Sequence, residues 1–189
     1  MGPRLLGAVL GLVLVQVQVA VQDLDLQKIA GFWREVGVAS HQNLALKTPK
    51  RPEALFLTLR GAELTVKAAY NGSGGCETEN IVGAEVDVSG RFVFPGRREI
   101  QVMDTDYERY AILRLSLLWQ GRAFHVLKYF TRSLEDQDEP GFWRFRELTA
   151  DTGLYLVARH GRCAELLKEV SAGRSAPAAG RTLPAPASG

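Results

Sequence analysis

Two cysteines, Cys76 and Cys163, have the clearest covalent chemistry in this chain. A thiol pair forms a disulfide in an oxidising compartment, whereas thiols in a reducing one more often act as nucleophiles or metal ligands. A zinc site needs more ligands at short spacing, and the three histidines, His41, His125 and His160, are scattered along the sequence. The chain also lacks the Gly-x-Ser-x-Gly turn that presents a nucleophilic serine. The sequence therefore predicts no metal, no cofactor and no enzyme activity.

The N-terminus predicts the compartment. Residues 1–4 carry a positive charge, residues 5–15 are an unbroken apolar run, and the small residue Ala20 comes soon after. This is the plan of a secretory signal peptide, and we expect it to span residues 1–20. The alternative is a membrane anchor, but a spanning helix needs about 20 apolar residues, and Gln16 and Gln18 interrupt the sequence directly after the apolar run. We expect a secreted protein without a membrane span.

Secretion changes how the cysteines and one asparagine are interpreted. In an oxidising compartment Cys76 and Cys163 are expected to pair, which closes a loop of about 90 residues and contributes about 4 kcal/mol. Two free thiols, or a bridge between two chains, remain as alternatives. The sequence Asn71-Gly72-Ser73 is a glycosylation sequon in a glycine-rich turn, so Asn71 is a predicted glycosylation site.

The elements that must position these residues are short strands separated by turns. Eight such segments are predicted, at residues 33–40, 54–59, 63–70, 78–86, 91–94, 99–105, 110–119 and 122–131. Eight strands with short connections are typical of an up-and-down barrel or a sandwich. Residues 135–153 then change to a helical period, and residues 154–158 resemble a ninth strand.

The chain divides into three predicted parts. A signal peptide at residues 1–20 precedes one domain at residues 21–170, and the last part, residues 171–189, has too few apolar side chains to form a core and is expected to be disordered. The net charge of +2 gives no reason to expect a nucleic-acid partner.

Alternation along the strands predicts which side chains point inward. Many of them are small or medium-sized, which favours a cavity over a filled interior. The predicted lining is apolar and consists of Val66, Ala68, Tyr70, Phe92, Phe94, Ile100, Val102, Leu113, Leu115 and Val126.

The last strand has two alternative phases. In one phase Lys128 points into the cavity, together with Val126 on the same face of the strand. In the other phase Lys128 is solvated and Leu127 and Tyr129 point inward. If Lys128 faces inward, a ligand carboxylate would gain a charge-assisted hydrogen bond, so an acid should bind better than its alcohol.

Three short motifs occur in a fixed order along these strands. They are a Gly-x-Trp tripeptide, a Thr-Asp-Tyr tripeptide and one arginine before the helical segment, formed by Gly31, Trp33, Thr105, Asp106, Tyr107 and Arg132. In this order they resemble the lipocalins over about residues 24–168. The resemblance implies that the three motifs meet at the closed end of a barrel, with Arg132 over the Trp33 ring. It also places Cys76 and Cys163 where the common lipocalin disulfide lies.

The resemblance implies an all-β fold, an eight-stranded antiparallel up-and-down barrel with one C-terminal α-helix packed outside. It implies a monomeric carrier of a small lipophilic molecule such as a retinoid, fatty acid or steroid-like compound. The known enzyme type among lipocalins uses a cysteine thiol in the cavity as its nucleophile. Both cysteines here are assigned to the bridge, so this nucleophile is not expected.

Within the family, the segment Gly74-Gly75-Cys76 resembles the epididymal lipocalins. This likeness implies a protein of the luminal fluid around maturing sperm, with a cell-surface receptor or the sperm surface as a candidate partner. The alternative function is a defence lipocalin that sequesters a microbial small molecule, which would need several inward cations.

Overall fold

The structure, a computed structural model, describes residues 24–41, 51–119, 121–133, 140–150 and 161–172. The predicted signal peptide, the predicted ninth strand and nearly all of the predicted disordered tail lie outside these residues.

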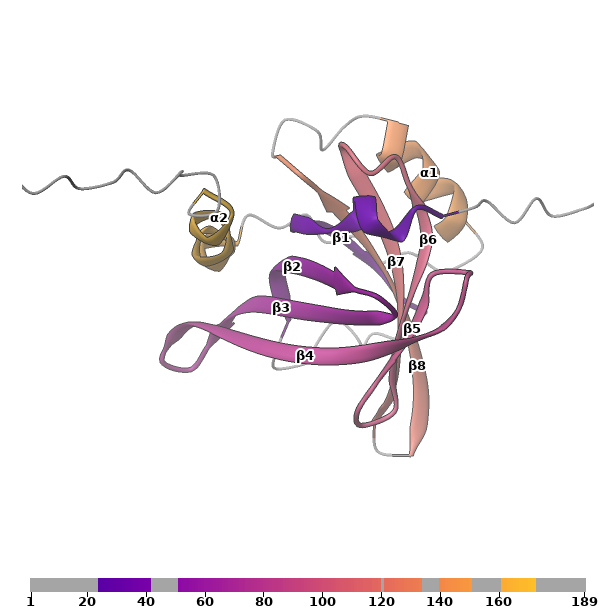
Figure 1. Ribbon diagram of the computed structural model, residues 1–189, viewed down its shortest axis with the longest axis horizontal. Coiled ribbons are helices and arrows are strands. Elements are labelled where there is room, and N and C mark those ends of the chain that lie inside the picture. The colour runs from indigo at the N-terminus through magenta and orange to yellow at the C-terminus, as the bar shows by residue number, and fades with distance from the viewer. Residues whose placement is uncertain (1–23, 42–50, 120, 134–139, 151–160, 173–189) are drawn as a thin grey trace, which may run out of the picture.

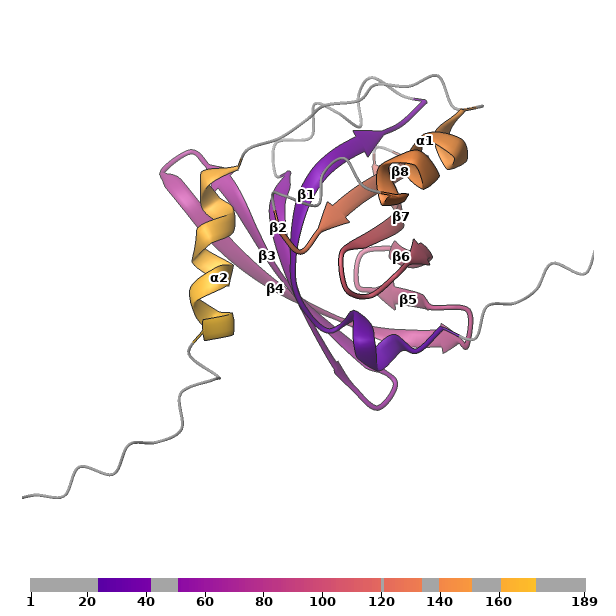
Figure 2. The same cartoon turned by 90° about the horizontal axis from the view of Figure 1, so that it is seen from above.

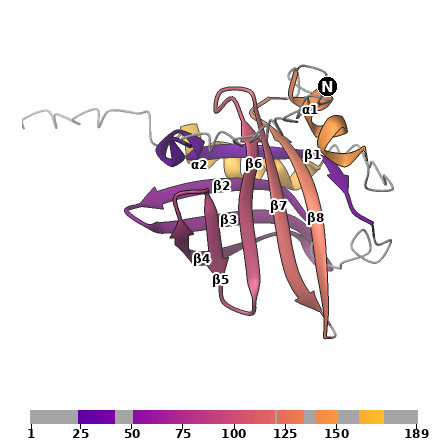
Figure 3. The same cartoon turned by 90° about the vertical axis from the view of Figure 1, so that its right-hand side faces the viewer.

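Eight antiparallel strands form one closed barrel in sequence order, with β1 pairing both β2 and β8. Figure 3 shows β6, β7 and β8 running steeply past β1, β2 and β3. Each predicted strand is present within three residues of its expected bounds. The strands are β1 (Gly31–Ala39), β2 (Pro52–Arg60), β3 (Glu63–Gly72), β4 (Gly75–Asp87), β5 (Arg91–Phe94), β6 (Arg98–Thr105), β7 (Tyr110–Trp119) and β8 (Arg122–Thr131).

Alternation along the strands fills the interior of the barrel with apolar side chains. Trp33, Phe92 and Phe130 are fully buried there with aliphatic residues from β2, β3, β6 and β7. A short 3-10 helix, η1 (Leu26–Ile29), crosses one end of the barrel just before β1 (Figure 1), and Ile29 packs into the same cluster. This end of the barrel is therefore closed by packed side chains.

Strand β1 contains an irregularity that changes the direction of its side chains. Its register with β8 shifts between Glu35 and Gly37. Trp33 lies in the inner cluster, and Val38 packs inside the barrel against Val126, whereas Val36 packs on the outer face. A β-bulge of this kind breaks simple alternation and re-aims the side chains beyond it.

Two helices cover separate parts of the outer surface (Figure 2). Helix α1 (Pro140–Thr149) packs on β7 and β8, where the buried Phe145 ring stacks on Tyr129 with centroids 5.5 Å apart. Helix α2 (Glu165–Ala172) comes directly after the 3-10 turn η4 (Arg162–Ala164) and packs against β1 and β2.

Of the two helices, the sequence predicts only the first. Within the predicted helical segment, residues 135–153, the described residues form α1 from Pro140, a residue suited to the first turn of a helix, to Thr149, and residues 135–139 and 151–153 lie outside the described residues. Helix α2 was not predicted, and it extends two residues into the segment expected to be disordered from Ser171 onward. Leu167 is fully buried against the outer face of the barrel, so tertiary packing supports this short helix.

Candidate functional site

The barrel encloses an apolar cavity of about 460 Å³ at the end opposite η1. Its size lies within the range of small-molecule sites. Its apolar wall comes from β1 to β8 and consists of Val38, Pro52, Leu55, Val66, Ala68, Tyr70, Ile81, Phe94, Ile100, Leu115, Leu117, Val126 and Phe130. The polar and charged residues at its edge and interior are Arg51, Glu79, Arg98, Glu99, Ser116 and Lys128.

Most of the predicted lining residues are at the cavity wall. The structure places Val66, Ala68, Tyr70, Phe94, Ile100, Leu115, Val126 and Lys128 there. Three others, Phe92, Val102 and Leu113, point inward as expected but belong to the packed cluster around Trp33. They are not among the residues that line the cavity, and a role for them in ligand binding stays a prediction.

Other wall residues were missed by the sequence analysis. Leu55 and Ile81 lie in parts of β2 and β4 whose register with β3 is regular, so the same periodicity could have identified them. Val38 lies just beyond the bulge in β1, and no simple pattern in the sequence marks its direction.

The last strand adopts the phase in which Lys128 points inward. Lys128 is 6% exposed and lines the cavity between Val126 and Phe130 of the same strand face. Tyr129 points outward and packs under α1. The charge of Lys128 is paired. Its ammonium forms an ion pair and a hydrogen bond with Oε2 of Glu35, whose side chain is fully buried.

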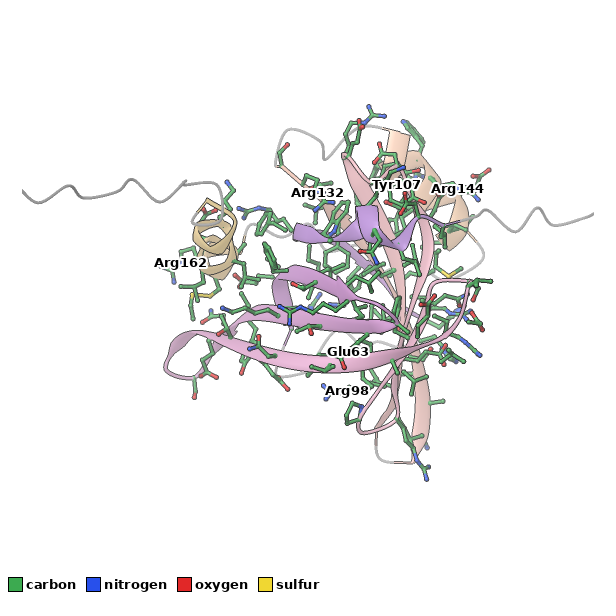
Figure 4. All side chains as sticks on the ribbon, viewed as in Figure 1. Glu63, Arg98, Tyr107, Arg132, Arg144 and Arg162 are labelled. Atoms are coloured by element: carbon green, nitrogen blue, oxygen red, sulfur yellow. A yellow bond between two sulfur atoms is a disulfide. The ribbon has the colours of Figure 1, made fainter. Side chains whose placement is uncertain are left out.

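The mouth of the cavity carries further charges. Arg98 Nη1 lies 4.0 Å from Glu79 Oε1, and both side chains are partly exposed. Figure 4 shows Arg98 at the end of the barrel opposite Arg132 and Tyr107. Such an exposed pair is screened by solvent and contributes little to stability.

Within the described residues, no three His, Cys, Asp or Glu side chains are placed to hold a metal ion. Ser116 Oγ lies 2.9 Å from His125 Nδ1, but this contact is exposed to solvent. The arrangement is that of a binding cavity.

The comparisons with known proteins agree with this geometry. Residues 30–155 match the model of the lipocalin / cytosolic fatty-acid binding protein family. The chain belongs to this family. Lipocalins are binding and transport proteins.

Two relatives are similar over most of their length. The chain is 74% identical to human epididymal-specific lipocalin-8 over 75% of this chain and 81% of that protein. It is 64% identical to the mouse protein of the same name over 89% of this chain and 98% of that protein. Among solved structures, one titled "Siderocalin Q83 reveals a dual ligand binding mode" matches with a TM-score of 0.60 at 25% identity, covering 74% of this chain and 94% of that one.

The lipocalin motifs meet at the closed end of the barrel. The guanidinium of Arg132 lies 3.7 Å from the centroid of the Trp33 ring, and the Trp33 indole N–H donates to the carbonyl of Ile29 at 2.7 Å. Gly31 has φ +105°, and a Cβ there would lie 2.9 Å from Arg132 Nη1. A side chain at this position would displace the arginine that covers the indole.

The Thr-Asp-Tyr motif forms a loop that presents a backbone acceptor to the same arginine. The Thr105 hydroxyl accepts from the backbone N–H of Tyr107, and Asp106 Oδ1 accepts from those of Arg109 and Tyr110. Burial opposes ionisation of Asp106, but these N–H donors together with the Arg109 guanidinium outweigh it, so the pKa of Asp106 is lowered. The carbonyl of Tyr107 accepts from Arg132 at 3.0 Å.

The predicted disulfide between Cys76 and Cys163 is confirmed. It joins β4 to η4, and the Cys163 N–H donates to Glu53 Oε2 at 2.8 Å. The predicted glycosylation site, Asn71, is exposed at the end of β3. Glycosylation itself stays a prediction.

Proposed function

We propose that this lipocalin is a secreted carrier that binds one small lipophilic molecule in the cavity of its barrel. The ligand classes proposed are retinoids, fatty acids and steroid-like molecules. The observation that carries the proposal is an apolar cavity of about 460 Å³ closed at one end by packed side chains. Burial of apolar ligand surface in such a cavity contributes about 25 cal/mol per Å².

The names of relatives support the same class of ligand. A 27% identical protein from Gallus gallus, matched over 66% of this chain and 72% of that protein, is an extracellular fatty acid-binding protein. The likeness to epididymal-specific lipocalin-8 supports a role in epididymal fluid during sperm maturation. We propose that the carrier is monomeric and that a receptor or the sperm surface takes up its cargo.

Secretion rests on the N-terminal sequence and on the extracellular relatives. In the part of the chain that the structure describes, no helix is long and apolar enough to cross a bilayer.

A second candidate function is the sequestration of an anionic microbial molecule. It is favoured by three cations in the cavity lining, Arg51, Arg98 and Lys128. Against it, Lys128 is paired with Glu35, and Arg98 lies beside Glu79. The positive field that an anionic chelate requires is therefore largely compensated, and the apolar carrier is the better-supported proposal.

The experiment is a titration with a panel of fluorescent lipophiles, including cis-parinaric acid, and with a ferric catecholate complex. Ala68→Trp places a large ring in the cavity and should abolish binding of the lipophiles. Val82→Trp is the matched control, because Val82 lies on the neighbouring strand, is 44% exposed and faces outward. Micromolar binding that Ala68→Trp removes and Val82→Trp keeps would support the carrier. Binding of the ferric complex alone would favour the second candidate.

A further inference from the structure

The Lys128–Glu35 pair is the one ion pair between described residues in which both side chains are almost completely buried. It joins β8 to β1 across the bulge, and Lys128 lines the cavity between two apolar neighbours, Val126 and Phe130. Every other ion pair of the described residues has at least one partner that is substantially exposed. A buried pair of this kind is costly to desolvate, so it is weak evidence for stability.

The pair changes the chemistry that the lysine presents to a ligand. A lone buried ammonium would attract a carboxylate, which is the expectation from the sequence alone. Here the charge of Lys128 is already compensated by the carboxylate of Glu35. A ligand carboxylate would add a second negative charge beside Glu35 in a poorly hydrated cavity, and an uncompensated charge in such surroundings is strongly disfavoured.

The same pair has hydrogen-bonding capacity to spare. Glu35 Oε1 is buried and has no hydrogen-bond partner in the structure. A buried acceptor without a donor costs free energy until a donor reaches it. The Lys128 ammonium has three N–H donors, of which Glu35 Oε2 accepts one. Glu35 is not among the residues that line the cavity, so the pair meets a ligand through the remaining N–H donors of Lys128.

We propose that Lys128 and Glu35 form a polar subsite that selects lipophiles ending in a hydroxyl over those ending in a carboxylate. A hydroxyl is neutral and can accept a hydrogen bond from the Lys128 ammonium without placing a second negative charge beside Glu35. This inference rests on the proposed carrier function and deepens it, because it names the head group of the ligand. It also reverses the preference expected when Lys128 is considered without Glu35.

The test compares two alcohol–acid pairs with wild-type protein at pH 7.4: retinol with retinoic acid, and oleyl alcohol with oleic acid. Displacement of a bound fluorescent lipophile gives the four dissociation constants. The subsite predicts that each alcohol binds at least about tenfold more tightly than its acid. Equal affinities, or tighter binding of the acids, would overturn the inference while leaving the carrier function standing. If neither alcohol nor acid binds at micromolar concentration, the carrier function fails, and the inference fails with it.

A variant then assigns the preference to the pair. Glu35→Gln keeps the size of the side chain and removes its charge, so Lys128 is left as an uncompensated cation. The acids should gain at least about tenfold relative to the alcohols, and the order of affinities should reverse. If the folded variant keeps the wild-type order, the pair does not select the head group.

The matched control is Glu165→Gln. Glu165 accepts from Arg34 at 2.6 Å on the outer side of β1, so this change also removes the partner of a buried cation, but outside the barrel. It should leave the alcohol–acid ratio unchanged. Thermal unfolding shows whether each variant is folded, and should Glu35→Gln not fold, the wild-type comparison alone decides the inference.

Discussion

The Arg132 guanidinium covers the Trp33 ring and donates hydrogen bonds to the carbonyls of Phe32, Tyr107 and Lys28. Burial lowers the pKa of Arg132 to about 10, so the group stays charged at neutral pH. These hydrogen bonds join η1, β1 and the Thr-Asp-Tyr loop through one side chain. Lysine could not reproduce this planar set of contacts, because its ammonium is a compact point charge.

A double-mutant cycle tests this contact. Trp33→Ala removes a fully buried indole and should lower the free energy of unfolding by about 3–5 kcal/mol. Arg132→Ala should cost less. The double variant should cost less than the sum of the two, because the side chains touch. Urea unfolding measures all three values, and strict additivity would show that the cation–π contact contributes nothing.

Lys128 and Glu35 differ in how well their positions can be predicted from the sequence. Alternation along the last strand places Lys128 inward in one of two phases. Alternation from Trp33 places Glu35 inward as well, but its pairing with Lys128 depends on the register of β1 against β8, which shifts between Glu35 and Gly37. A single-residue shift in register is a property of the strand pairing, and periodicity within one strand does not show it.

Among the elements, helix α1 shows most clearly how an outer helix is attached to the barrel. Its buried Phe145 stacks on Tyr129, whereas Trp143 on the same helix is 65% exposed. Phe145→Ala should therefore lower the free energy of unfolding by about 3–5 kcal/mol. Trp143→Ala, the control on the same helix, should change it by no more than about 0.5 kcal/mol. Equal effects in chemical denaturation would mean that α1 does not pack as described.

The disulfide attaches a second outer segment to the barrel, because it joins η4 to β4. Replacing Cys76 and Cys163 together with serine should lower the free energy of unfolding by about 2–5 kcal/mol, because the closed loop spans 87 residues. A reductant should destabilise the wild type to a similar extent and leave the double variant unchanged. Two alkylatable thiols on the folded, oxidised protein would contradict the pairing.

The helices were less predictable than the strands. The recurrence of Phe142, Phe145 and Leu148 indicated α1, and Pro140 marks its start. The residues of α2 include Leu166, Leu167 and Lys168, all strong helix formers, and this propensity was the available signal. A helix of eight residues is stable only where it packs, and its site on the barrel depends on the fold rather than on the segment.

At the scale of the molecule, eight alternating segments with short connections predict a barrel or a sandwich, and the resemblance of the three motifs to the lipocalins favours the closed barrel. The depth at which the filled interior ends and the cavity begins cannot be predicted from this alternation. Phe92, Val102 and Leu113 have the same alternation as Phe94, Ile100 and Leu115. All six belong to or pack against the cluster around Trp33, yet only the last three also line the cavity. Depth along the barrel, which depends on the shear of all eight strands together, separates the two sets.

The most direct test of the carrier function is native mass spectrometry of the folded protein after incubation with a lipid extract. The cavity predicts one lipophilic molecule bound to each chain, and it predicts that the Ala68→Trp protein, whose cavity is filled, carries none. Recovery of wild type without any adduct, or equal loading of wild type and Ala68→Trp, would show that the barrel cavity is not the binding site and would contradict the carrier function proposed for it.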